Sequence, residues 1–257
     1  MKRVALLLPD ENNPYQQHLV REAQAAAGSD VEMLPPRFAG GLAMNQIPQI
    51  FEAIRATPRA DAILIMMAGG EALEKTLEKV VREGIACIFL NRTPSFVGSL
   101  RALSPETLIA SVKPDQRRIG AIQAEQCLAL NPASGFVLLV VGALSTPSAV
   151  ERRDGFRAAV GRRLEVHDLE GNWTSAGAEH ALRDWYRLGA DRQRSVKAIV
   201  CQNDPMAEGV HKVLVEHGPE ARAIPVLGCE GLPEEGAKAF GRGVQLVTIG
   251  PEGPEPR

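Results

Sequence analysis

The sequence lacks the features by which several large classes of protein are recognised. No apolar run reaches the roughly 18 residues that a membrane-spanning helix requires, so we expect no membrane insertion. The formal net charge is −2, so no basic field favours direct binding of nucleic acid. The four cysteines form no CxxC pair, and Cys87 and Cys201 lie in apolar runs. We therefore predict small buried thiols and no metal site.

The motifs of common catalytic sites are also missing. The chain has no phosphate-binding P-loop, no GxSxG and no HExxH. The segment Gly241-Arg242-Gly243 is too short for a dinucleotide fingerprint, and it precedes an apolar run where the fingerprint would open a helix. The five histidines show no metal-ligand spacing. We therefore predict a protein that is not an enzyme and that needs no cofactor.

Short apolar runs alternate with amphipathic segments, and this order occurs twice. The apolar runs are 4–9, 31–34, 62–67 and 86–90 in the first series, and 136–141, 164–169, 198–201 and 224–228 in the second. The amphipathic segments are 15–27, 46–56 and 71–83, then 149–160, 176–188 and 206–216. Such alternation is typical of βαβ units around a parallel sheet. The repetition predicts two similar doubly wound α/β lobes, and one large doubly wound sheet is the alternative.

Two segments are predicted to cross between the lobes. Residues 101–114 separate the two series, and residues 245–249 form a later apolar run. We predict a first lobe over 1–112, a second lobe over 113–246, and a return crossing with a tail over 247–257. Two crossings would make a hinge of several strands, which suits a protein whose lobes close on a ligand.

Polar side chains follow the predicted strands directly. In open parallel sheets, ligands bind beyond the carboxyl ends of the strands. Short amides, carboxylates and arginines gather at these places, and they suit a neutral polyhydroxyl ligand because they pair with hydroxyl groups as donors and acceptors. Tyr15 and Trp173 offer aromatic surface for the C–H face of a sugar ring.

Simpler structural roles compete with ligand binding at several of these positions. Asn13 before Pro14 is also a candidate helix cap. In Asn203-Asp204-Pro205 we expect Asp204 to cap the following helix, which leaves Asn203 for the ligand. Arg92 and Arg152 are alternatively members of surface ion pairs.

Several motifs together point to one protein family. They are NNPY at 12–15, ADAILI at 60–65, IACIFLNR at 85–92, ERRDGF at 151–156, AIVCQNDPMAEGV at 198–210 and PVLGCEGLPEEG at 225–236. On these motifs the chain, from about residue 3 to 250, resembles the ribose-binding type of periplasmic sugar-binding proteins and the related sensor domains of LacI-type repressors. The resemblance implies the type I periplasmic-binding-protein fold. Since the family continues for roughly thirty residues past the last crossing, we expect this chain to be truncated at its C-terminus.

The resemblance also implies a set of ligand contacts. These residues are Asn13, Tyr15, Gln16, Asn91, Arg92, Arg152, Trp173, Asn203 and Glu230. Three of them depart from the family pattern: Asn91 replaces a common Asp, Gln16 replaces a frequent aromatic residue, and Glu230 replaces an Asp. The identity of the sugar is therefore left open by the sequence.

The function implied by the resemblance is that of a solute-binding protein. It would close on a small polar ligand, with a sugar as the best candidate, and serve an ABC-type permease or a sensor protein. The family is periplasmic, but residues 4–9 are too short for a signal peptide, so a cytoplasmic location stays open. The alternative is a cytoplasmic effector-sensing domain of a LacI-like regulator without its DNA-binding region, because the first strand begins at about residue 3.

Overall fold

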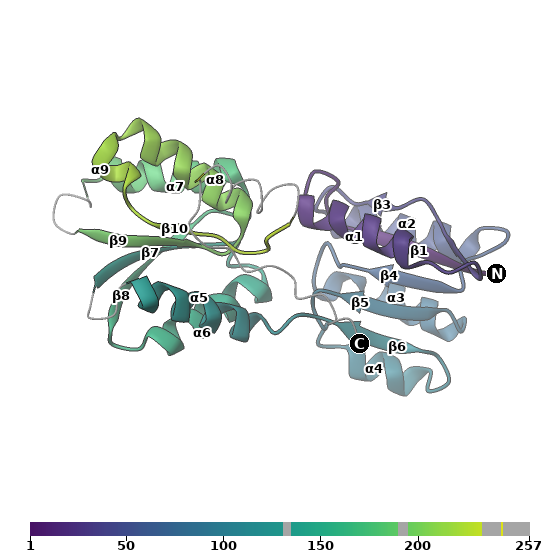
Figure 1. Ribbon diagram of the computed structural model, residues 1–257. Helices are drawn as coiled ribbons and strands as arrows, with labels where there is room; N and C mark the ends of the chain where they lie inside the picture. Colours follow the sequence, from purple (N-terminus) through teal and green to yellow (C-terminus); the bar gives the residue numbers. More distant parts are fainter. Residues whose placement is uncertain (131–134, 190–194, 233–242, 244–257) are drawn as a thin grey trace. The chain divides into compact units, whose positions relative to one another are not determined.

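Parallel β-sheets flanked by helices make up both parts of the chain. The computed structural model describes residues 1–130, 135–189, 195–232 and Gly243 (Figure 1). The chain divides into two units, Met1–Pro114 and Asp115–Arg257. The prediction of α/β lobes built on parallel sheets is confirmed.

The first unit carries a parallel sheet with strand order β2-β1-β4-β5-β6, and β3 also pairs with β1. Its elements are β1 (Lys2–Leu8), α1 (Pro14–Ala26), β2 (Val31–Met33), β3 (Arg37–Phe38), α2 (Ala43–Arg55), β4 (Ala62–Ile65), η1 (Glu71–Leu73), α3 (Glu74–Arg82), β5 (Ala86–Leu90), α4 (Val97–Leu103) and β6 (Ile109–Val112). Because every described pairing is parallel, the carboxyl ends of these strands share one edge.

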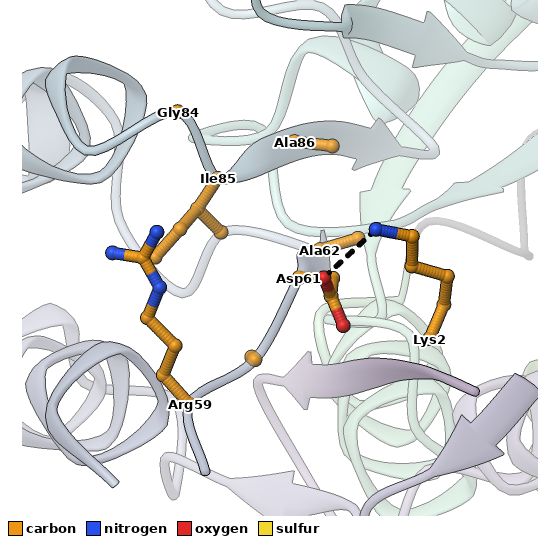
Figure 2. A pocket seen from close by; sticks show the side chains of 8 residues that line it. Lys2, Arg59, Asp61, Ala62, Gly84, Ile85 and Ala86 are labelled. Carbon is orange, nitrogen blue, oxygen red and sulfur yellow. Dashed lines mark hydrogen bonds and ion pairs between the residues drawn. The ribbon is translucent and has the colours of Figure 1, made fainter. Parts of the chain in front are cut away.

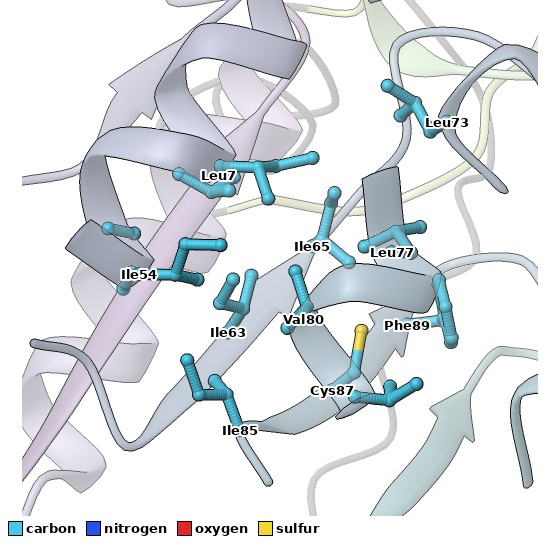
Figure 3. Packing of buried hydrophobic residues seen from close by; sticks show 14 of the residues in the cluster. Leu7, Ile54, Ile63, Ile65, Leu73, Leu77, Val80, Ile85, Cys87 and Phe89 are labelled. Carbon is cyan, nitrogen blue, oxygen red and sulfur yellow. The ribbon is translucent and has the colours of Figure 1, made fainter. Parts of the chain in front are cut away.

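Alternate strand residues build the core of the first unit on both faces of this sheet. Ile63 and Ile65 of β4 pack with Val80 of α3 on one face, as Figure 3 shows, while Leu6 and Leu8 of β1 pack under α1 on the other. Burial on both faces explains why these strands read as nearly continuous apolar runs in the sequence.

The second unit has a parallel sheet with strand order β10-β9-β7-β8. Its elements are α5 (Gln116–Leu130), β7 (Gly135–Val141), α6 (Pro147–Val160), β8 (Leu164–Glu170), α7 (Ser175–Arg187), β9 (Val196–Cys201), α8 (Asp204–Glu216), α9 (Pro219–Arg222) and β10 (Val226–Leu227). One face of the sheet packs against α7 and α8, and the other packs against α5 and α6.

The cysteines are buried as predicted. All four are free thiols in the interior. Burial raises the pKa of Cys127 to about 11 and that of Cys87 to about 12, so these thiols stay protonated at neutral pH. They behave as small apolar side chains.

Helix α5 was not predicted, and its composition explains why. Its buried positions are Gln116, Gly120, Gln123, Ala124 and Cys127, which are small or polar and give no apolar stripe. The segment 101–114, predicted as a crossing, holds the end of α4 and strand β6. Strand β6 pairs with β5 in parallel, and Ile109 lies opposite Cys87 at the start of this pairing. The predicted return crossing over 247–257 lies outside the described residues.

Within the described ranges, no helix combines the length and the apolar character needed to cross a membrane.

Helices α5 and α6 approach closely because a glycine lies on each side of their contact. A Cβ atom on Gly120 would lie 2.0 Å from the carbonyl oxygen of Arg152, and one on Gly155 would lie 2.1 Å from that of Arg117. Since both obstructing atoms belong to the backbone, a larger residue requires the helices to separate.

We therefore expect Gly155→Ala to destabilise the second unit by about 1–3 kcal/mol, the usual cost of overpacking. Urea unfolding followed by tryptophan fluorescence measures this, since Trp173 and Trp185 both lie in that unit. The control is Gly98→Ala in α4, where an added Cβ meets nothing within 4 Å; its stability, followed by circular dichroism, should stay the same or rise by about 0.4–1 kcal/mol. An unchanged urea midpoint for Gly155→Ala would contradict this account of the helix contact.

Candidate functional site

The carboxyl edge of the second sheet is organised by the side chain of Gln202, which is fully buried. Its Oε1 accepts a hydrogen bond of 3.0 Å from the backbone N–H of Gly142, just after β7. Its Nε2 donates a bond of 3.0 Å to the carbonyl of Ala149 in the first turn of α6. The Gln202 amide therefore links the ends of β7 and β9 and the start of α6, at the edge where the predicted ligand contacts lie.

Arg152 is built into this framework. Its Nε donates to Oε1 of Gln116, and its Nη1 donates to the backbone carbonyl of Gln202. Nη1 also lies 3.7 Å from Sγ of Cys229. Among the described residues, Nη2 has no hydrogen-bond partner. The side chain is 7% exposed and its hydrogen-bond acceptors are neutral, so the surface ion pair considered for Arg152 is wrong.

Trp173 lies directly beside Arg152. The guanidinium carbon lies over the indole ring, 5.4 Å from its centroid. Nε1 of the indole donates to Oγ1 of Thr146 at 3.3 Å. Trp173 has a φ of +63° and follows Asn172, whose φ is +52°. Two consecutive non-glycine residues in the left-handed region are uncommon, and such strain persists only where the surrounding structure enforces it.

Asn203 supplies part of that enforcement. Its Nδ2 donates to the carbonyl of Trp173 at 3.0 Å, and its Oδ1 accepts from the N–H of Met206 at 3.0 Å. Asn203 is therefore the N-cap of α8, and the prediction that Asp204 caps this helix is wrong. Pro205 occupies the second helical position, which moves the cap one residue earlier. The carboxylate of Asp204 instead accepts from the N–H of Gly231 at 2.7 Å.

Glu230 belongs to the same edge. It follows β10 with a φ of +104°, and the next residue, Gly231, has a φ of +59°. The bond from Gly231 to Asp204 holds this turn against the start of α8. The sheet of the second unit thus brings Arg152, Trp173, Asn203 and Glu230 to a common edge, as the sequence indicated.

In the first unit, two of the predicted contacts serve the backbone. Asn13 caps α1, since its Oδ1 accepts from the N–H of Gln16 at 3.2 Å. Gln16 is buried, and its own Oε1 accepts from the N–H of Asp10 at 2.8 Å, just after β1. Tyr15 packs against the cluster that contains Leu6 and Met66. The capping role weighed for Asn13 is confirmed.

Arg92 differs from these residues because part of its polar surface is unsatisfied. It follows Asn91, whose φ is +66° and whose N–H donates to the carbonyl of Val112 at 2.8 Å. The Nε of Arg92 is buried and has no hydrogen-bond partner within the described part of the chain. Burial lowers the pKa of its guanidinium. A buried donor without an acceptor is costly, so this atom marks a place where a ligand acceptor would be stabilising.

A hollow of about 270 Å³ lies at the opposite, amino edge of the first sheet. Figure 2 shows Lys2 and Asp61 joined on one side of it and Arg59 on the other. The Asp61 carboxylate accepts from the backbone N–H of Arg3 at 2.8 Å and from Nζ of Lys2 at 3.1 Å. The Arg3 bond is the main cause of the lowered pKa of Asp61, and Lys2 adds to it. Because the Asp61 carboxylate is already bonded to these two groups, it holds the strand ends together and gives no evidence of a ligand site.

Gln116, Gly142 and Thr146 were not among the predicted ligand contacts. Gln116 bonds to Arg152, while Gly142 and Thr146 lie against Trp173. Gly142 directly follows the apolar run of β7, and a glycine at a strand end is a signal of close approach. Gln116 lies in the helix that the pattern did not reveal. Among the described residues, no group of three His, Cys, Asp or Glu side chains could hold a metal ion.

We expect Gln202→Leu to destabilise the second unit by about 2–4 kcal/mol, because it leaves two buried backbone groups, on Gly142 and Ala149, without partners. The matched control is Gln126→Leu in α5, whose buried Oε1 already lacks a partner among the described residues, so that stability should be unchanged or higher. Urea unfolding monitored by tryptophan fluorescence compares the two. Equal free energies of unfolding for Gln202→Leu and Gln126→Leu would show that the amide of Gln202 is dispensable.

Solved structures similar to this chain share its fold. A fructose-binding periplasmic domain of a hybrid two-component system has 21% identity and a TM-score of 0.77, over 98% of this chain and 80% of that one. A solute-binding protein from Bacillus halodurans, with bound myo-inositol, has 21% identity and a TM-score of 0.77; the match covers 95% of this chain and 80% of that one. A solute-binding protein from Actinobacillus succinogenes, with bound D-allose, has 19% identity and a TM-score of 0.80; the match covers 95% of this chain and 84% of that one.

No curated protein sequence gives a significant match. A family model does, and it spans nearly the whole chain: the model of the periplasmic binding protein domain matches residues 4–254. The resemblance inferred from the motifs is thereby confirmed, and the chain belongs to the periplasmic binding protein domain family.

Proposed function

We propose that this chain is a solute-binding protein for a sugar or polyol and performs no catalysis. Family membership supports a binding role, and the similar structures described above were solved with, or are named for, D-allose, myo-inositol and fructose. These likenesses favour solute binding over the effector-sensing domain of a LacI-like regulator. By the same reasoning we propose a periplasmic location, with an ABC-type permease or a sensor protein as the partner.

The observation that carries the proposal is the unsatisfied Nε of Arg92 at the carboxyl edge of the first sheet. A hydroxyl or ring oxygen of a sugar is an acceptor that fits this donor. In the second unit, Nη2 of Arg152 is likewise without a partner in the described residues, while the rest of that guanidinium is held rigid. A donor held in place loses little conformational entropy when a ligand binds, which favours affinity.

The remaining proposed contacts belong to the same two units as these arginines. They are Asn13, Tyr15, Gln16 and Asn91 in the first unit, and Trp173, Asn203 and Glu230 in the second. Because Asn13, Gln16 and Asn203 already bond to the backbone, we propose that they reach a ligand only through the polar capacity that those bonds leave unused.

Isothermal titration calorimetry against D-allose, myo-inositol, fructose and L-arabinose tests the proposal. We expect saturable heat with at least one of them and a rise in melting temperature with its concentration, because a ligand that binds only the folded state stabilises it. Absence of both heat and thermal shift across the panel would count against sugar and polyol binding.

Arg92→Leu separates ligand recognition from folding. Since Nε has no partner among the described residues, we expect the free protein to keep or gain stability, while affinity for the best ligand of the panel falls about 10- to 100-fold. Arg82→Leu is the control, because Arg82 is exposed on α3 and away from the carboxyl edge; it should change neither quantity. Titration calorimetry and urea unfolding measure the two effects. A loss of stability with unchanged affinity would assign Arg92 a structural role.

A further inference from the structure

The feature that the proposed function leaves unexplained is how the Trp173 indole is held in a strained place. The backbone at Trp173 has a φ of +63°, and the ring packs against Gly142 at the end of β7. A Cβ atom on Gly142 would lie 1.9 Å from Cε2 of the indole and 2.3 Å from both Cδ2 and Cζ2. The ring therefore occupies the space that any side chain at position 142 would need.

The backbone of Gly142 cannot easily yield to make room for a side chain. Its N–H is bonded at 3.0 Å to Oε1 of Gln202, a side chain that is fully buried and also tied to α6. A substitution at Gly142 would therefore displace the indole more readily than the strand end.

Thr146 fixes the indole from a second direction. It occupies the N-cap position of α6, where threonine ordinarily bonds to a backbone N–H of the first turn, yet its side chain makes no such bond. Its hydroxyl donates to the carbonyl of Ala143 at 2.7 Å and so presents a lone pair to Nε1 of Trp173 at 3.3 Å. Helix α6 therefore lacks a side-chain cap, and the threonine hydroxyl serves as the acceptor for the indole N–H.

We propose that Gly142 and Thr146 are positioning residues that hold the Trp173 indole against the Arg152 guanidinium in the ligand-binding edge of the second unit. Gly142 supplies the space and Thr146 sets the rotation of the ring. Since the indole N–H is already bonded, Trp173 offers a ligand its apolar surface only, and the polar recognition next to it falls to Arg152. This inference rests on the proposed sugar or polyol binding for its functional part.

The test uses the Trp185→Phe protein as parent, which leaves Trp173 as its one tryptophan. In this parent, Gly142→Ala should shift the Trp173 emission, raise its quenching by acrylamide, and lower affinity for the tightest ligand among D-allose, myo-inositol, fructose and L-arabinose by about tenfold or more. Thr146→Val should act in the same direction more weakly. Thr146→Ser, which keeps the hydroxyl, should match the parent. Gly98→Ala in α4 is the neutral control.

Circular dichroism and urea unfolding establish that each variant is folded, and the two threonine variants decide the matter if Gly142→Ala does not fold. Unchanged emission and quenching in folded Gly142→Ala and Thr146→Val would overturn the positioning role. A displaced indole with unchanged affinity would overturn its importance for binding. If the parent binds no member of the panel, the proposed function fails, while the fluorescence of the ligand-free protein still decides whether Gly142 and Thr146 hold the ring.

Discussion

The structure depends on hydrogen bonds from buried glutamine side chains to the backbone where parallel strands end. A strand that leaves its sheet exposes N–H and C=O groups that the ladder no longer pairs, and such groups are costly when buried. In the first unit, Gln46 donates to the carbonyl of Met66 and accepts from the N–H of Ala68, directly after β4. In the second unit, Gln123 donates to the carbonyl of Cys201, the last residue of β9, and to that of Gly228, directly after β10.

Gln16 and Gln202 do the same after β1 and β7. A glutamine suits this task because its amide has both a donor and an acceptor at the end of a flexible stem, carries no charge, and therefore avoids the desolvation cost of a buried carboxylate. The strand ends at the carboxyl edges are thus tied by hydrogen bonds before any ligand arrives. Tied strand ends suit a binding site, since little conformational entropy is then lost on binding.

This framework separates polar groups that maintain the fold from those left for a ligand. Asn13 and Asn203 cap helices, and Gln16 secures a strand end. Arg92 is different, because its Nε is buried without a described partner. Arg152 stands between the two cases: two of its nitrogens fasten α6 to α5 and β9, and the third faces no described acceptor. The same side chain can therefore support the edge and take part in recognition.

The sequence by itself determined the α/β class and the repeated order of strands and helices, because strands buried on both faces of a parallel sheet consist of nearly continuous apolar runs. Its motifs also indicated the family. It also indicated the edges at which the polar candidates gather. Only the tertiary structure decided what each candidate does. Asn203 caps α8 in place of the predicted Asp204, because the position of Pro205 within the first turn depends on the packed helix. Helix α5 and the roles of Gly142 and Thr146 were equally hidden, since they arise from contacts between residues distant in sequence that no local pattern records.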